Sequence, residues 1–170
     1  MDKFIIEGGR KLGGEFVPQG NKNAALPILA ACLLTEDDVI LHNVPQIRDV
    51  LDMRQLLASL GAHFEDIDES TWKVSAKQIH AREIDPDLAK RIRASILLAG
   101  PVTARAGEII LPPPGGDVIG RRRIDTHIWA LRKLGAEVEY ERTFSFKRGA
   151  RLVGADILPV SYTHLRAHET

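Results

Sequence analysis

Apolar residues recur along the chain with two periods, one typical of helices and one typical of strands. Ile124, Ile128, Leu131 and Leu134 return every three or four residues, which places them on one helical face. Short runs rich in β-branched residues, bounded by turn residues, favour strands. Together the two patterns predict helices at 23–34, 46–60, 86–98 and 123–134, and strands at 4–7, 39–42, 62–67, 72–75, 108–111, 137–140 and 145–147. The predicted fold class is α/β.

One helix-to-strand passage occurs twice in the sequence. Residues 56–65 and residues 130–140 match each other, and each contains an apolar-periodic helix that ends at a glycine before a strand begins. The two glycines, Gly61 and Gly135, are 74 residues apart. Glycine readily adopts the left-handed conformation that ends many helices. We therefore expect a repeated α/β unit with a left-handed glycine at each of these helix ends.

A second, weaker match relates residues 150–159 to residues 10–18 near the start of the chain. The stretch that follows it should then contain a cap and an apolar helix. Residues 160–170 show neither an apolar period nor strand alternation. We expect about two repeat units and the beginning of a third over residues 1–159, and a non-native tail over residues 160–170.

Composition excludes several classes of function. The 23 basic residues cancel the 23 acidic ones, so no overall field attracts nucleic acid or an anionic membrane. The longest apolar stretch, residues 27–34, is far shorter than the roughly 20 residues of a membrane span. The N-terminus lacks the apolar region of a secretion signal. The single cysteine, Cys32, lies among apolar residues and is expected in the core. These features predict a cytoplasmic protein without a membrane or nucleic-acid partner.

The segment from Gly20 to Leu34 is a candidate anion site, because a Gly-Asn-Lys-Asn turn leads directly into an apolar helix. Asn21 or Asn23 can cap that helix, and Pro27 is expected in or near its first turn. The unpaired N–H groups of a helix start attract anions, and Lys22 adds a positive charge beside them. An ordinary capped helix with a solvated lysine is the alternative.

The loop from Leu111 to Asp125 separates a strand from a helix and is rich in Pro, Gly and Arg. Long loops of this kind often carry function. Three arginines, residues 121–123, stand at the helix start, where the helix dipole does not favour cations unless an anion joins them. A nucleic-acid patch is the competing interpretation, but no aromatic residues are interleaved with the arginines. Arg93 borders an apolar helical face and is expected to reach a cleft, although a solvated charge is possible there.

These segments together resemble bacterial UDP-N-acetylglucosamine enolpyruvyl transferase over residues 1–159. The sister family, shikimate 3-phosphate enolpyruvyl transferase, shares the fold, but its phosphate-binding segment built around Ser and Arg is absent here. The ordered series of motifs carries the resemblance: IEGGRKLGGE, GNKNAALPILAACLL, NVPQIRDV, LGA, RASILLAGP and PGGDVIGRRRIDTHI.

The resemblance implies an inside-out barrel of repeated α/β units, with helices inside and sheets outside, here truncated. It also implies a reaction in which the enolpyruvyl group of phosphoenolpyruvate moves to the 3-hydroxyl of UDP-N-acetylglucosamine and phosphate leaves. This is the first committed step of peptidoglycan synthesis. No metal or organic cofactor is expected. His164 and His168 have a metal-binding spacing, but a pair without a third ligand makes a weak site. Oligomeric state is left open.

By position, the resemblance implies that Lys22 and Asn23 hold phosphoenolpyruvate and that the lysine offsets charge as phosphate departs. Arg93 would bind the nucleotide sugar. Arg122 would contact both substrates. The residues expected to line the nucleotide-sugar site are Arg122, Arg123, Ile124, Asp125 and Thr126.

Asp117 occupies the loop position where most of the family has a cysteine thought to protonate the methylene carbon of phosphoenolpyruvate. An aspartic acid could donate that proton if the closed loop raised its pKa. Fosfomycin alkylates the cysteine, so resistance to fosfomycin is expected. The alternative is a turn residue after Gly115 and Gly116.

The chain itself is expected to show no turnover, because the family's active site contains further residues that have no counterpart in this chain. A noncatalytic anion-binding or RNA-binding module built from the same repeats is the alternative function.

Overall fold

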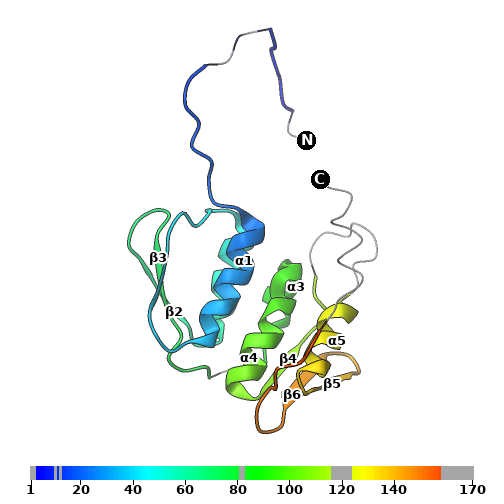
Figure 1. Ribbon diagram of the computed structural model, residues 1–170. Helices are drawn as coiled ribbons and strands as arrows, with labels where there is room; N and C mark the ends of the chain where they lie inside the picture. The colour runs from blue at the N-terminus through cyan, green and yellow to red at the C-terminus, as the bar shows by residue number, and fades with distance from the viewer. Residues whose placement is uncertain (1–2, 10, 12, 81–82, 116–123, 158–170) are drawn as a thin grey trace.

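The computed structural model describes residues 3–9, 11, 13–80, 83–115 and 124–157. Within these residues the chain forms two three-stranded sheets with helices between them (Figure 1). The α-helices are α1 Lys22–Ala31, α2 Arg48–Ser59, α3 Pro86–Arg91, α4 Ala99–Ala106 and α5 Asp125–Lys133, and two 3-10 helices are η1 Cys32–Leu34 and η2 Arg93–Leu98. The strands are β1 Val39–Leu41, β2 His63–Asp66, β3 Trp72–Ser75, β4 Glu108–Leu111, β5 Ala136–Tyr140 and β6 Phe144–Arg148.

The two sheets have the same topology. Their strand orders are β1-β3-β2 and β4-β6-β5, and in each the last strand in sequence lies in the centre, antiparallel to both neighbours. The helices that precede β2 and β5 end at Gly61 and Gly135, whose φ angles are 108° and 92°. The predicted repeated α/β unit and its two left-handed glycines are therefore confirmed.

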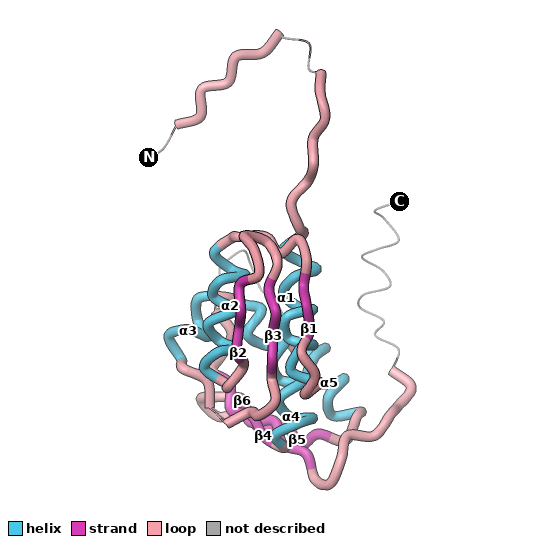
Figure 2. The backbone as a smooth tube through the Cα atoms, turned by 90° about the vertical axis from the view of Figure 1, so that its left-hand side faces the viewer, coloured by secondary structure: helices cyan, strands magenta, loops and turns pink. Residues whose placement is uncertain are grey.

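The core lies between the sheets and the helices. Side chains alternate along the central strands, so that Trp72 and Val74 of β3 and Phe144 and Phe146 of β6 face inward. Figure 2 shows the first sheet in front of α1 and α2. Helix α4 packs against η1, η2 and β4, and so it joins the two units. This layering, with helices inside and sheets outside, is the one that the resemblance implied.

Two predicted elements need correction. The single helix expected at 86–98 is two helices, because Ile92 is extended (φ −131°, ψ 139°) and buried between α3 and η2. Helix α4 was not predicted; its first turn contains Gly100 and Pro101, two residues of low helix propensity. Pro101 is tolerated there because it lies in the first turn of the helix, where the N–H groups have no partner within α4 itself.

The strand expected at 4–7 is also wrong. Residues 3–9 have no regular secondary structure, and Phe4, Ile5 and Ile6 are about nine-tenths exposed. Figure 1 shows the segment before α1 running away from the packed body. A strand needs a hydrogen-bonded neighbour, and no strand of the described sheets pairs with this segment.

Candidate functional site

The start of α1 is held by its own sequence. Asn21 is the N-cap, and its Oδ1 accepts hydrogen bonds from the backbone N–H groups of Asn23 (2.7 Å) and Ala24 (3.3 Å). Of the two asparagines considered for this role, Asn21 therefore takes it. Lys22 is the first residue of the helix, so its charge lies beside the positive end of the helix dipole.

The loop after β1 fixes the turn that precedes α1. The backbone N–H of Gly20 donates to Oδ1 of Asn43 (3.1 Å), and Asn43 has a left-handed backbone with φ 55°. A Cβ atom on Gly20 would overlap the backbone carbonyl oxygen of Asn43. Only glycine therefore allows the two backbones to approach so closely. Two motifs that are distant in sequence, GNKN and NVPQ, meet at this contact.

Pro27 lies deeper in α1 than expected. It stands in the second turn rather than the first. Because proline has no N–H, the carbonyl of Asn23 lacks its usual helical donor. Asn23 and Pro27 both line the pocket described next.

A pocket of about 430 Å³ opens where α1 begins, beside η2 and α5. We call it the α1–α5 pocket. It brings together three residues predicted to bind substrate, Lys22, Asn23 and Arg93, from two separate parts of the sequence. The lining residues are Lys22, Asn23, Leu26, Pro27, Asp49, Ile92, Arg93, Ala94, Ile96, Leu97 and His127.

Two ionisable residues of the pocket were missed from the sequence. Asp49, in the first turn of α2, lies with its Oδ2 2.8 Å from the Nζ of Lys22. His127, the third residue of α5, has a pKa lowered by burial and also by the nearby positive charge of Arg93. Both residues fall within motifs that carried the resemblance, NVPQIRDV and PGGDVIGRRRIDTHI, but their residue types alone assigned them no role.

The remaining predicted residues divide into two groups. Ile124, Asp125 and Thr126 stand at the beginning of α5, just before His127; Ile124 packs against the core and Asp125 is exposed. They are near the pocket but are not among its lining residues. Asp117, Arg122 and Arg123 lie outside the described residues.

The described residues that precede Asp117 in sequence, up to Gly115, pack close to a segment that lines the pocket. A Cβ atom on Gly115 would overlap the backbone of Lys90 at the end of α3. Lys90 is two residues before Ile92, which lines the pocket. The near side of the Pro- and Gly-rich loop is therefore anchored against the same segment that delivers Arg93.

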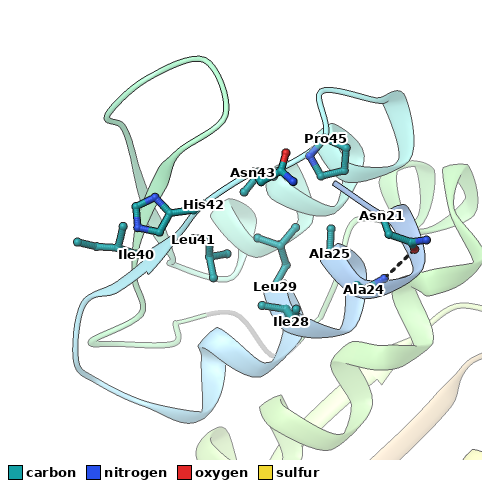
Figure 3. A pocket seen from close by; sticks show the side chains of 11 residues that line it. Asn21, Ala24, Ala25, Ile28, Leu29, Ile40, Leu41, His42, Asn43 and Pro45 are labelled. Atoms are coloured by element: carbon teal, nitrogen blue, oxygen red, sulfur yellow. Dashed lines mark hydrogen bonds between the residues drawn. The ribbon is translucent and has the colours of Figure 1, made fainter. Parts of the chain in front are cut away.

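A second hollow, of about 240 Å³, lies between α1 and β1 (Figure 3). Ile28 and Leu29 of α1 face Ile40 and Leu41 of β1 across it, with His42 and Asn43 at its rim. Its lining residues include no Lys, Arg, Asp or Glu. The charged α1–α5 pocket is therefore the better candidate site for an anionic ligand.

Two further searches cover the described part of the chain only. No helix in it combines the length and the apolar character that crossing a membrane requires. In the same residues, no three His, Cys, Asp or Glu side chains gather in a way that could hold a metal ion. His164 and His168 fall outside these residues. Cys32 is buried, as expected, and burial raises the pKa of its thiol.

Two units of one sheet topology, with a pocket lined by Lys22 and Arg93 at a helix start, define an α/β repeat protein with a candidate site for an anion. The sequence profile described as EPSP synthase (3-phosphoshikimate 1-carboxyvinyltransferase) matches residues 6–157, and the chain belongs to this family of transferases.

Curated relatives named UDP-N-acetylglucosamine 1-carboxyvinyltransferase match the chain at about half identical residues. The chain is 55% identical over 155 residues to UDP-N-acetylglucosamine 1-carboxyvinyltransferase of Bradyrhizobium diazoefficiens, covering 91% of this chain and 36% of the relative. It is 50% identical over 157 residues to the protein of the same name from Treponema denticola, covering 92% of this chain and 37% of the relative. The predicted resemblance is confirmed, and the chain spans little more than a third of the length of these curated relatives.

Solved structures confirm the fold. The enolpyruvyl transferase NikO from Streptomyces tendae superposes with a TM-score of 0.68 at 23% identity, covering 86% of this chain and 32% of that one. An EPSP synthase from Acinetobacter baumannii superposes with a TM-score of 0.63 at 18% identity, covering 86% of this chain and 34% of that one. The predicted enolpyruvyl transferase architecture is therefore correct.

Proposed function

We propose that the chain serves transfer of the enolpyruvyl group of phosphoenolpyruvate to the 3-hydroxyl of UDP-N-acetylglucosamine, with release of phosphate. The observation that carries the proposal is the α1–α5 pocket, which joins Lys22 and Asn23 to Arg93. The names of relatives about half identical in sequence support the same reaction. The reaction would take place in the cytoplasm as a step of peptidoglycan synthesis.

The roles follow from the chemistry of the side chains. Lys22, beside the positive end of α1, would hold the phosphate of phosphoenolpyruvate and offset its charge as it leaves. Asn23 would add a neutral hydrogen bond to the same ligand. Arg93 would bind the nucleotide sugar, whose diphosphate suits a guanidinium donor.

The other residues proposed to act on the substrates lie in sequence at the start of α5 and just before it. Arg122 would contact both substrates, and Asp117 would donate the proton to the methylene carbon. These residues lie outside the described ranges, so their roles rest on the sequence resemblance. The residues proposed to line the nucleotide-sugar site are Arg122, Arg123, Ile124, Asp125 and Thr126.

The test is binding, because the chain spans only about a third of the relatives that carry the activity in their names. Phosphoenolpyruvate and UDP-N-acetylglucosamine are each titrated into the chain by calorimetry. We expect saturable binding, loss of phosphoenolpyruvate binding in Lys22→Ala, and no change in Lys133→Ala, which removes an exposed lysine from the far end of α5. We expect no phosphate release from the two substrates together.

Two results would overturn the proposal. One is the absence of saturable binding of either substrate by a folded chain. The other is RNA binding with a steep salt dependence, which would favour a noncatalytic anion-binding or RNA-binding module.

A further inference from the structure

We propose that His127 contacts the phosphate group of the ligand in the α1–α5 pocket and takes up a proton from solvent when that group binds. The inference deepens the proposed function and rests on it. Its structural basis is the position of the imidazole, which lines the same pocket as Lys22, Asn23 and Arg93. Residue 127 was given no role by the sequence, and it adds the only imidazole to the described lining of this pocket.

Each of the other elements that form the pocket contributes a charged group to the lining that His127 shares. Lys22 comes from α1, Asp49 from α2 and Arg93 from η2. Asp125 stands two residues before His127 on its own helix. The lysine and Asp49 form an ion pair at 2.8 Å, whereas the charge of Arg93 acts on the histidine directly.

The surroundings of the imidazole favour its neutral form. Burial removes solvent from the protonated ring, and the guanidinium of Arg93 repels it, so the pKa of His127 lies below its ordinary value of 6.5. A neutral ring offers one N–H donor and one lone pair. It therefore adds a hydrogen bond to the site without adding a third positive charge.

A bound phosphate group reverses the balance of charge. Its negative charge offsets that of Arg93 and attracts the protonated ring, and a protonated ring can donate a charge-assisted hydrogen bond. The ring nitrogen gains one proton from solvent, and no bond within the ligand breaks. Binding of the anion and binding of the proton therefore strengthen each other by the same factor.

Two ligands carry this chemistry, phosphoenolpyruvate and the diphosphate of UDP-N-acetylglucosamine. Both are tested separately, together with sulfate. Phosphate monoesters titrate near pH 6, so their own protonation would confuse the result. Sulfate remains a dianion over the whole range and isolates the protein group.

The first experiment follows the ring of His127 by NMR from pH 5 to pH 8, without and with saturating amounts of each ligand. We expect its pKa to rise by about one unit or more with at least one phosphate ligand and with sulfate. The exposed His63 on the outer sheet face serves as an internal control and should not move. This measurement needs no variant, so it does not depend on whether a substitution folds.

The second experiment compares His127→Asn with His63→Asn by calorimetry at pH 6 and pH 8. The ligand titrated is the one that shifts the pKa of His127, with sulfate in parallel. We expect His127→Asn to weaken its binding roughly tenfold at pH 6 and less than about twofold at pH 8, as linked protonation requires. His63→Asn should match the wild type at both values. The ligand that shifts the histidine identifies which phosphate group lies beside it.

Failure of this inference is distinct from failure of the proposed function. Lys22-dependent binding of phosphoenolpyruvate, together with a His127 pKa that none of the three ligands shifts, would overturn only the role of the histidine. Absence of phosphoenolpyruvate and UDP-sugar binding would overturn the proposed function and this inference together.

Discussion

The Nζ of Lys22 lies 2.8 Å from Oδ2 of Asp49, so an ion pair joins the first turn of α1 to the first turn of α2. Both side chains are partly exposed, at 46% and 40%. Ion pairs of this exposure contribute roughly 0–1 kcal/mol to folding. The pair therefore affects ligand binding more than folding, because the Asp49 carboxylate already pairs with the lysine that an incoming phosphate would bind.

Asp49→Asn should tighten the binding of small anions. Without the carboxylate, Lys22 no longer has to exchange partners and one repelling charge leaves the pocket. We expect affinity for phosphoenolpyruvate, measured by calorimetry, to rise about three- to tenfold, with a change in unfolding free energy below about 1 kcal/mol. Asp87→Asn, at an exposed acid in the first turn of α3, is the control. Weaker binding in Asp49→Asn would show instead that the carboxylate positions the lysine.

Arg105 of α4 should be among the most important polar residues for stability. Its side chain is 16% exposed. The guanidinium donates to backbone carbonyls of Leu33 (3.1 Å), Thr35 (3.0 Å), Ala76 and Lys77 (3.1 Å), and to the carboxylate of Glu36 (3.2 Å). It thereby ties the ends of η1 and β3 to the helix that joins the two units. Loss of the guanidinium would leave several carbonyls without a donor.

We expect Arg105→Met, which keeps an apolar stem, to lower the unfolding free energy in urea by about 2–4 kcal/mol. Glu36→Gln should cost less than about 0.5 kcal/mol, because this carboxylate is 77% exposed. Equal effects of the two variants would mean that the ion pair, rather than the carbonyl contacts, carries the contribution.

Asp66 should make the fold sensitive to acid. Arg54 donates to both of its carboxylate oxygens, at 2.6 Å and 2.9 Å, while the guanidinium lies 4.6 Å from the ring of Trp72. These hydrogen bonds lower the pKa of Asp66 below its ordinary value of 3.8. The folded protein therefore binds this proton less readily than the unfolded chain, so the pair stabilises above pH 3.8 and the contribution is lost as pH falls through the lower, folded value.

Denaturation between pH 5 and pH 2, followed by tryptophan fluorescence, tests this dependence. Asp66→Asn and Arg54→Met should both flatten the loss of stability below pH 4, because each removes the same pair. An unaltered slope in Arg54→Met would exclude the guanidinium as the cause.

Local patterns predicted most elements of the fold but not the breaks between helices. The strands β3 and β4 were predicted at their observed bounds, and Gly61 and Gly135 at their observed conformations, because these features depend on neighbouring residues. The break at Ile92 depends on burial of that side chain among other elements. Helix α4 forms despite Gly100 because packing against both units outweighs a weak local propensity.

The candidate site was predicted only in part, because some of its residues are brought together by contacts between elements that are distant in the sequence. Motifs placed Lys22, Asn23 and Arg93 in one function, and the structure brings these three residues into one pocket. Asp49 reaches it through the packing of α2 beside α1, and His127 reaches it because the start of α5 lines the same pocket as η2. No local sequence signal encodes a contact between residues so far apart in the chain.

The last prediction concerns Asp117, whose position in the family usually holds the cysteine that fosfomycin alkylates. A carboxylate is a weaker nucleophile than a thiolate, so we expect no covalent adduct after incubation with fosfomycin, as seen by mass spectrometry of the intact chain. The cysteine of the wild type, Cys32, should not react either, because its thiol is buried and burial raises its pKa.

Asp117→Cys supplies the matched gain of function. We expect this variant to acquire one adduct, mapped to residue 117 by peptide analysis, because the substitution restores the nucleophile that the family uses. Lys22→Ala in the same background should slow labelling, since fosfomycin carries a phosphonate that the lysine would hold beside the loop. Labelling of Asp117 in the wild type would contradict the predicted resistance. Labelling of Asp117→Cys at the same rate with and without Lys22 would show that the loop and the α1–α5 pocket do not form one site.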